Sequence, residues 1–278
     1  MRFPFSPSPR RKNKLLTICI GTICDNGKAC VVAADREITV PALNLEFEHA
    51  DKKIEDIVDG CVVMSSGDAL LAAQVVERTR LALGGGEPRV LNVAEKLRDT
   101  YISAHLERAE HAFLTPRGWT LKEFKERGGA QIPAQTYLNI DNQLFNFGLN
   151  VVEFLVAGVD TTGAHIFRVF YSGVLGGDWL EWCDRLGYRA VGSGSSHASI
   201  SLALEGQQRR LSVPETLYNV YSAKRNSEAA PGVGKATDMV ILTTGNVSTV
   251  SDHRLKKLDE IREKHLKEKP GPTELEGI

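Results

Sequence analysis

Two consecutive, almost entirely apolar strand segments constrain this fold more than any other feature of the sequence. Residues 15–24 and 28–34 are rich in Val, Ile, Thr and Cys, and Asp25-Asn26-Gly27 between them supplies the turn of a hairpin. A sheet with one solvated face would alternate apolar and polar residues, which these segments do not. The hairpin therefore belongs to a sheet that is covered on both faces, although it ends in the charged run Asp35-Arg36-Glu37.

The rest of the chain groups strands and helices into separate blocks. The expected elements are, in chain order, strands at 53–57 and 61–64, helices at 68–83 and 92–113, an irregular insertion at 115–150 with a short helix after Trp119, strands at 154–160 and 165–170, helices at 195–205 and from Ser212, and a strand at 239–243. Asn92 with Glu95, and Ser212 with Glu215, have the spacing of capping boxes. This segregation predicts an α+β fold in which two stacked sheets each carry helices on the outside.

Both ends of the sequence differ from its middle. Residues 1–14 contain five basic residues, three prolines and no acidic residue, which predicts a disordered arm or a removable prefix. Leucine and isoleucine recur near one helical face in residues 252–269, among balanced charges. We therefore divide the chain into a prefix at 1–16, a domain at 17–250, and a charged helix with a disordered tail at 251–278.

Composition argues against several classes of function. The 34 basic residues nearly balance the 35 acidic ones, so nucleic acid is not an expected partner. No apolar run reaches the roughly 18 residues of a membrane span, so we expect no membrane partner. The five cysteines lack the paired short spacing of zinc ligands. We expect buried free thiols in a cytoplasmic protein, with neither a metal nor a cofactor.

Several short motifs resemble, in order and in approximate spacing, those of the proteasome subunits and related N-terminal-nucleophile hydrolases. They are Thr17-Ile-Cys-Ile-Gly21, Val31-Val-Ala-Ala-Asp-Arg-Glu-Ile-Thr39, Asp51-Lys-Lys-Ile54, Ser66-Gly67, Ala157-Gly-Val-Asp160, Val191-Gly-Ser-Gly-Ser195 and Thr237-Asp-Met-Val-Ile-Leu242. The resemblance runs from about residue 17 to 245, is interrupted by the insertion, and is closest to the catalytic β-type subunits. It implies a four-layer αββα sandwich and a threonine peptidase acting on peptides or proteins. It further implies autocatalytic removal of the prefix, a homo-oligomeric ring and an ATP-dependent unfoldase as partner.

The resemblance assigns roles to five residues, and the chemistry of each fits its role. Thr17, once it is the first residue, would be the nucleophile, with its own α-amine as the base; an α-amine accepts a proton more readily than lysine near neutral pH. Lys53 would supply a fixed positive charge beside the hydroxyl, and Asp35 would pair with Lys53. The backbone N–H of Gly67 would donate to the oxyanion, and Ser193 would orient the amine or a water.

The same five residues also admit purely structural roles. Asp35 and Lys53 could form an ordinary ion pair at a sheet rim, and Thr17 could be a plain strand residue. Gly67 and Ser193 could belong to tight turns. On sequence alone these structural roles stay open beside the catalytic ones.

The chain also departs from the family pattern. Leu16 precedes Thr17, where the family usually has glycine at the self-cleavage point. The family's supporting aspartate, near the end of the helix that begins at Ser212, has no equivalent here other than Asn226 or Glu228. Two further functions therefore stay open: a non-catalytic assembly subunit with the same fold, and a peptide ligase or transferase that passes the acyl group to another amine.

Overall fold

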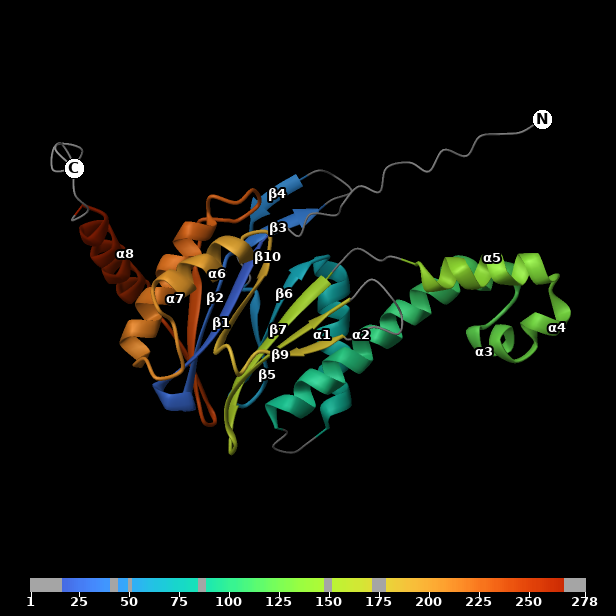
Figure 1. Ribbon diagram of the computed structural model, residues 1–278, viewed down its shortest axis with the longest axis horizontal. Coiled ribbons are helices and arrows are strands. Elements are labelled where there is room, and N and C mark those ends of the chain that lie inside the picture. Colours follow the sequence, from blue (N-terminus) through green and yellow to red (C-terminus); the bar gives the residue numbers. More distant parts are fainter. Residues whose placement is uncertain are drawn as a thin grey trace.

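The computed structural model describes residues 17–40, 45–49, 52–84, 89–147, 152–171 and 179–267. The fold is α+β, with two five-stranded antiparallel sheets, a two-stranded ribbon and helices (Figure 1). The expected prefix at 1–16 and the tail beyond residue 267 lie outside the described residues. Among the described helices, none combines the length and the apolar character that a membrane crossing requires.

Sheet I contains the hairpin that opens the described chain. Its strands are, in spatial order, β10 (Tyr188–Gly192), β1 (Ile18–Cys24), β2 (Ala29–Ala34), β11 (Asp238–Thr243) and β12 (Asn246–Thr249). Every residue of β1 and β2 is buried, as the apolar runs predict. A 3-10 turn (Asp25–Gly27) closes the hairpin with left-handed φ angles of 49° at Asp25 and 55° at Asn26. The predicted hairpin is therefore confirmed.

Sheet II carries the middle of the chain. Its strands are, in spatial order, β5 (Ile54–Val58), β6 (Cys61–Gly67), β7 (Val152–Asp160), β8 (Gly163–Phe170) and β9 (Leu180–Trp182). The separate ribbon pairs β3 (Glu37–Val40) with β4 (Leu45–Glu48). The sequence predicted the first four strands of sheet II, but not β9, the ribbon, β10 or β12.

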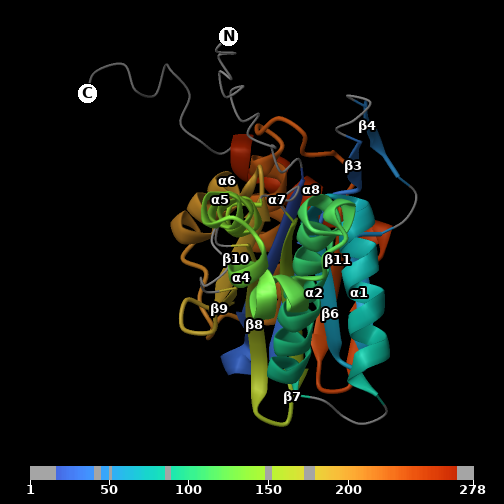
Figure 2. The same cartoon turned by 90° about the vertical axis from the view of Figure 1, so that its right-hand side faces the viewer.

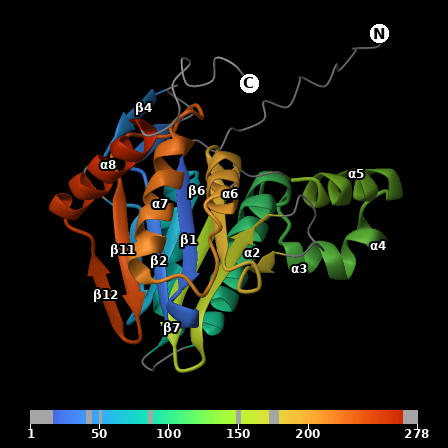
Figure 3. The same cartoon turned by 60° about the vertical axis from the view of Figure 1, so that its left-hand side comes forward.

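Helices cover the outer face of each sheet, and the inner faces meet. The main helices are α1 (Ala69–Leu83), α2 (Val90–Phe113), α6 (Ser195–Leu204), α7 (Val213–Ser227) and α8 (Asp252–Lys267). One buried cluster joins α1 and α2 to sheet II, whose strands they cover in Figure 2. A second cluster joins α6 and α7 to sheet I, over which these helices lie in Figure 3, and α8 adds partly buried leucines to it. A third cluster fills the space between the sheets, for example with Val32 against Leu155.

The start of α2 differs from the prediction. Asp68 caps α1 as expected, because its side chain accepts from the N–H groups of Leu70 and Leu71 at 3.1 Å. In contrast, α2 begins at Val90, without the capping box expected at Asn92. The Val90 N–H instead donates to Oδ2 of Asp160 at 2.9 Å, so the cap comes from the last residue of β7. A cap borrowed from 70 residues away leaves no signal in the local sequence.

The expected irregular insertion is largely helical. Residues 115–147, which we call the helical arm, contain a 3-10 turn (Thr115–Arg117), α3 (Leu121–Glu123), a π-helical turn (Phe124–Gly128), α4 (Gly129–Gln131) and α5 (Ala134–Phe145). The arm extends from the end of α2 away from both sheets (Figure 1). It has a small core of its own, in which Phe124 packs with Leu114, Ile140 and Leu144. The short helix expected after Trp119 is confirmed as α3, whereas the irregular structure expected for the rest of 115–150 was wrong for the described residues.

Candidate active site

Three of the predicted site residues meet where the two sheets approach each other. Thr17 immediately precedes β1 and Asp35 immediately follows β2, and the antiparallel pairing of these strands places both at one end of sheet I. Lys53 precedes β5 at the neighbouring end of sheet II. The Lys53 Nζ lies 2.6 Å from Oδ1 of Asp35 and also donates a hydrogen bond to Oγ1 of Thr17. The Thr17 hydroxyl in turn donates to Oδ1 of Asp35.

Asp35 is the buried anchor of this group. The side chain is 0% exposed, against 13% for Lys53, so the ion pair is largely removed from water. Its second oxygen, Oδ2, accepts the backbone N–H of Gly234 at 2.8 Å, and Oδ1 also lies 3.4 Å from the N–H of Ile18. A buried carboxylate without such partners would cost several kcal/mol. The paired carboxylate instead fixes the position of the ammonium beside the Thr17 hydroxyl.

The neighbouring charge at the end of the hairpin has a different partner. Arg36 donates two hydrogen bonds, of 2.6 and 2.7 Å, to the carboxylate of Asp238 on β11. This fork ties the end of β2 to the adjacent strand of the same sheet. Of these two neighbouring charges, Asp35 turns toward Thr17 and Lys53, and Arg36 turns toward Asp238.

Ser193 lies against the backbone of Thr17. The Thr17 N–H points at Oγ of Ser193 at 3.4 Å, and that hydroxyl donates to the carbonyl of Pro231 at 3.0 Å. The approach requires glycine at position 192, where φ is 103° and a Cβ atom would lie 2.2 Å from the Thr17 carbonyl oxygen. The turn that joins β10 to α6 thus holds a hydroxyl beside the backbone nitrogen of Thr17.

The remaining predicted donor, Gly67, ends β6 opposite Val152, with a φ of 116°. No hydrogen bond joins Gly67 to Thr17 within the described part of the chain, so its role as an oxyanion donor stays a prediction. The residue before it, Ser66, is only 2% exposed, and its Oγ lies 3.1 Å from the point that a Cβ on Gly192 would occupy. Among the described residues that hydroxyl has no hydrogen-bond partner. Ser66 therefore places an unpartnered hydroxyl close to Gly192, on the side where Gly192 approaches the Thr17 carbonyl.

Comparisons with known proteins leave this geometry as the guide to function. No protein-family model matches the sequence, and no curated protein matches it significantly. The arrangement consists of a hydroxyl in contact with an ammonium and a carboxylate, with the backbone nitrogen of the same residue facing a second hydroxyl. Such a group can hold a developing alkoxide and, if the chain begins at Thr17, supply an internal base.

Neither suggested replacement for the family's supporting aspartate reaches the site. The amide of Asn226 donates to Oγ of Ser201 at 2.9 Å, and Glu228 pairs with Lys224 at 2.7 Å and with Arg225 at 2.9 Å. No hydrogen bond or ion pair connects either side chain to Thr17 or Ser193 in the described residues. The described residues therefore show no contact through which Asn226 or Glu228 would take the role of that aspartate.

Lys224 was missed by sequence reasoning. Its side chain is fully buried on α7, and burial lowers the pKa of its ammonium. The Nζ donates to the carbonyls of Gly234 at 2.9 Å and Lys235 at 2.7 Å, and the N–H of the same Gly234 donates to Asp35. Lys224 thus anchors the loop at Gly234 and Lys235, and the backbone of this loop donates a hydrogen bond to Asp35. The spacing of four residues between Lys224 and Glu228 on a predicted helix was the only signal available.

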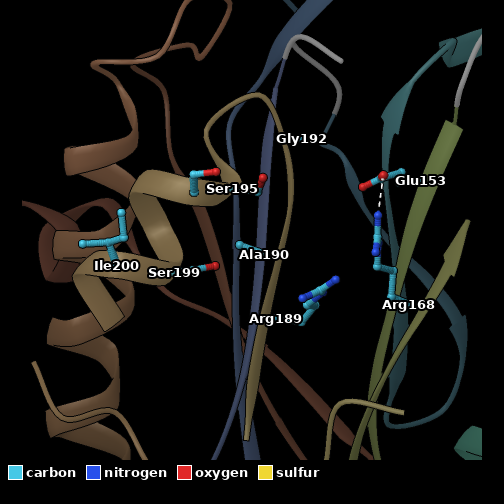
Figure 4. A pocket seen from close by; sticks show the side chains of 9 residues that line it. Glu153, Arg168, Arg189, Ala190, Gly192, Ser195, Ser199 and Ile200 are labelled. Atoms are coloured by element: carbon cyan, nitrogen blue, oxygen red, sulfur yellow. Dashed lines mark hydrogen bonds and ion pairs between the residues drawn. The ribbon is translucent and has the colours of Figure 1, made fainter. Parts of the chain in front are cut away.

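A pocket opens directly beside Gly192, between α6 and sheet II (Figure 4). It encloses about 480 Å³, a volume typical of small-molecule and peptide side-chain sites. The lining includes Glu153, Arg168, Arg189, Gly192, Ser195 and Ser199. Sequence reasoning did not find it, because these residues come from four separate elements. Elsewhere in the described residues, no cluster of three or more His, Cys, Asp or Glu side chains suits a metal ion.

Proposed function

We propose that this protein is a threonine-type peptidase of the proteasome-like N-terminal-nucleophile class, with Thr17 as its nucleophile. The observation that carries the proposal is the contact of Oγ1 of Thr17 with both Nζ of Lys53 and Oδ1 of Asp35. Two sheets stacked between helices also fit the αββα sandwich that the motif resemblance implies, and we propose that arrangement for this chain. In that class the chain is cut before the nucleophile, here between Leu16 and Thr17.

The proposed reaction uses the amine that this cut releases. The α-amine of Thr17 would lie beside Ser193, where the backbone N–H now lies, and it would accept the proton of the hydroxyl. Oγ1 of Thr17 attacks the carbonyl carbon of the scissile bond. The ammonium of Lys53 stabilises the negative charge that develops on Oγ1 as its proton leaves. The protonated α-amine of Thr17 then gives its proton to the nitrogen of the scissile bond. That bond breaks, the amine product departs, and the acyl group stays on Oγ1 as an ester. Water, activated by the same amine, hydrolyses the ester and restores the hydroxyl.

The mass of the purified protein and its reaction with an electrophile test this proposal together. We expect a species that begins at Thr17 and that gains one equivalent of a threonine-directed epoxyketone or boronate probe. The variant Thr17→Ala removes the hydroxyl, so it should retain the prefix, remain unlabelled and lose peptidase activity by about 10⁴-fold or more. Thr17→Ser keeps a hydroxyl beside the same amine and should retain measurable labelling.

Different results would support the other two functions. If the prefix persists and Thr17 takes up no probe, the chain is a non-catalytic subunit and the proposal is wrong. If an added amine captures the acyl group in place of water, the same ester serves a ligase or transferase. Hydrolysis in the presence of excess amine acceptor, with no transfer product in the mass spectrum, would dismiss that alternative.

A further inference from the structure

The pocket beside Gly192 brings two arginines from opposite sheets into one space. Arg168 enters from β8 of sheet II and Arg189 from β10 of sheet I, and the guanidinium of Arg189 points toward Arg168 in Figure 4. Arg168 pairs with Glu153 at 2.6 Å and with Glu181 at 3.2 Å, and Arg189 pairs with the same oxygen of Glu181 at 2.8 Å. These carboxylates hold the two like charges in place.

The pocket contains more hydrogen-bond donors than acceptors. A guanidinium carries five N–H donors, yet one carboxylate oxygen of Glu181 serves both arginines. Within the described residues, Nε of Arg168 and Nε of Arg189 are buried without a hydrogen-bond partner, so the donors that a ligand could reach are on the terminal nitrogens. Glu153 and Glu181 balance the charges of the two arginines, but they leave several of these N–H groups without an acceptor. A ligand carboxylate would supply the missing acceptors, whereas an ammonium would add donors where donors are already in excess.

The wall across from the arginines also favours an anion. Ser195 and Ser199 of α6 line it with hydroxyl groups (Figure 4). Ser195 begins the helix, and the residue before it, Gly194, offers no side chain to cap the first N–H groups. An uncapped helix start carries a partial positive charge. The wall with the two arginines and the wall formed by the start of α6 therefore both present a positive electrostatic potential to the pocket.

The position of the pocket relates it to one side of the scissile bond. Gly192 lines the pocket and also touches the Thr17 carbonyl, and the next residue, Ser193, faces the Thr17 nitrogen. In the proposed reaction that nitrogen gives its proton to the leaving amine. We propose that the pocket binds a carboxylate on the leaving side of the substrate, supplied by an acidic side chain or by a free C-terminus. This inference rests on the proposed peptidase function.

Two pairs of peptides test the inference. The first pair differs only in Glu or Gln directly after the scissile bond and is amidated at its C-terminus. The second pair has a short leaving segment that ends in a free carboxylate or in an amide. We expect kcat/KM to favour the acid over its amide about tenfold in at least one pair, because the amide lacks the charge that strengthens a hydrogen bond from a guanidinium, and solvent screens part of that gain. The pair that responds identifies the source of the carboxylate.

Variants of Arg189 test whether a preference for the acid over the amide peptide arises in the pocket. Arg189→Gln should bring the ratio of acid to amide close to one, and Arg189→Lys should keep part of it, because the charge stays while the fork is lost. The control is Arg78→Gln, which removes an arginine paired with Glu107 at 2.8 Å on the far helices and should keep the parent ratio. A preference in the parent that Arg189→Gln leaves intact would overturn the assignment of the pocket.

The inference and the proposed function can fail separately. If Thr17 takes up the probe but acid and amide peptides are cleaved at equal rates in both pairs, the pocket inference is wrong and the peptidase stands. If Thr17 does not react, the peptidase proposal fails, and isothermal titration of the unmodified chain with the same peptides decides the binding question. Equal affinity for the acid and the amide would then overturn the pocket inference as well.

Discussion

Thr17 depends on a close backbone approach that only glycine permits. At position 192 any side chain would begin 2.2 Å from the Thr17 carbonyl oxygen, and the φ of 103° is rare for other residues. A larger residue would push the turn that carries Ser193 away from Thr17. Glycine at 192 therefore belongs to the site although it supplies no reactive group.

Asp35 gives a direct test of how the site is held together. The variant Asp35→Asn removes the negative charge that faces Lys53 at 2.6 Å in a largely buried position. We expect urea denaturation to show a loss of about 3 kcal/mol or more, because a buried charge left without its partner is strongly destabilising. Probe labelling of Thr17 should fall in parallel, since the ammonium would no longer be fixed beside the hydroxyl.

The matched control for this substitution is Asp99→Asn. Asp99 also pairs with an arginine, Arg98, at 2.8 Å, but its side chain is 55% exposed. Exposed pairs contribute roughly 0–1 kcal/mol, so the stability of this variant should stay close to that of the parent. Equal losses of unfolding free energy in the two variants would show that the pair of Asp35 and Lys53 contributes no more than an ordinary surface ion pair.

The sequence predicted those site residues that lie in recognisable motifs. Thr17, Asp35 and Lys53 were assigned from motifs that resemble the proteasome-like family, and the structure brings the three side chains together. Ser66, Lys224 and Arg189 were not assigned in this way, and their roles depend on partners far away in the sequence, such as Gly192 for Ser66. No pattern within a single segment could have brought them together.

Helix α2 joins the sheets to the helical arm, and His105 lies within it. The ring is fully buried, with its centroid 4.6 Å from that of Tyr171, 5.7 Å from that of Trp179 and 5.7 Å from that of Phe147 near the end of the arm. Burial lowers the pKa of His105 below its ordinary value of 6.5. An ionisable group whose pKa is lowered by burial therefore lies where the arm meets the sheet.

The stability of this junction should depend on pH. Below about pH 6.5 the unfolded chain binds a proton that the folded chain binds only at still lower pH, so stability falls as the pH falls. His105→Phe keeps a ring but removes this group. The slope of unfolding free energy against pH should become shallower by up to about 1.4 kcal/mol per pH unit between pH 6.5 and the lowered pKa.

His111 provides the control for the acid slope, because it is exposed on the same helix. His111→Phe makes the identical change of side chain outside the buried ring cluster. The comparison requires urea titrations of the parent and both variants at several pH values between 5 and 7. Parallel slopes for the parent and His105→Phe would contradict the prediction.

Helices were predictable where their ends are marked locally. Asp68 and Ser212 cap the helices that follow them, and both starts appear in the sequence. In α2 the cap comes from Asp160, and α5 follows Pro133 with a run of Gln and Asn that favours loops. The short strands β9 and β12, of three and four residues, are too brief to show a period.

All five cysteines are buried and unbridged, as the sequence predicted. Burial raises the pKa of each thiol, to about 12 for Cys19 and Cys183 and to about 11 for Cys24. Cys30 and Cys61 shift in the same direction for the same reason. The interior thus holds a set of acids that ionise readily only when the protein unfolds.

This set should make the fold sensitive to alkali. Above the ordinary thiol pKa of 9.0 the unfolded chain loses protons that the folded chain keeps, so stability falls as the pH rises through 9. Cys61→Ala should reduce that slope by up to about 1.4 kcal/mol per pH unit. Val63→Ala, a neighbouring buried truncation on β6, should lower stability without changing the slope. Urea titrations between pH 8 and 10.5 measure both effects, and an unchanged slope in Cys61→Ala would refute the prediction.

The α+β class followed from the segregation of strands and helices along the chain, and it is confirmed with two antiparallel sheets and helices. Unbroken apolar runs require cover on both faces, and the predicted helices were the available cover. The position of the helical arm could not be predicted, because its core is small and separate from the other three clusters. The pocket likewise depends on how the two sheets sit against each other.

The place of β1 in its sheet has a consequence for biosynthesis. The strand lies between β2 and β10, and Ile18 pairs with Gly192. Thr17 emerges early from the ribosome, yet Ser193 and the Gly234 loop that holds Asp35 are translated much later. The proposed nucleophile therefore lacks its partners until nearly all of the described chain has left the exit tunnel, so a truncated translation product would carry Thr17 without a site around it.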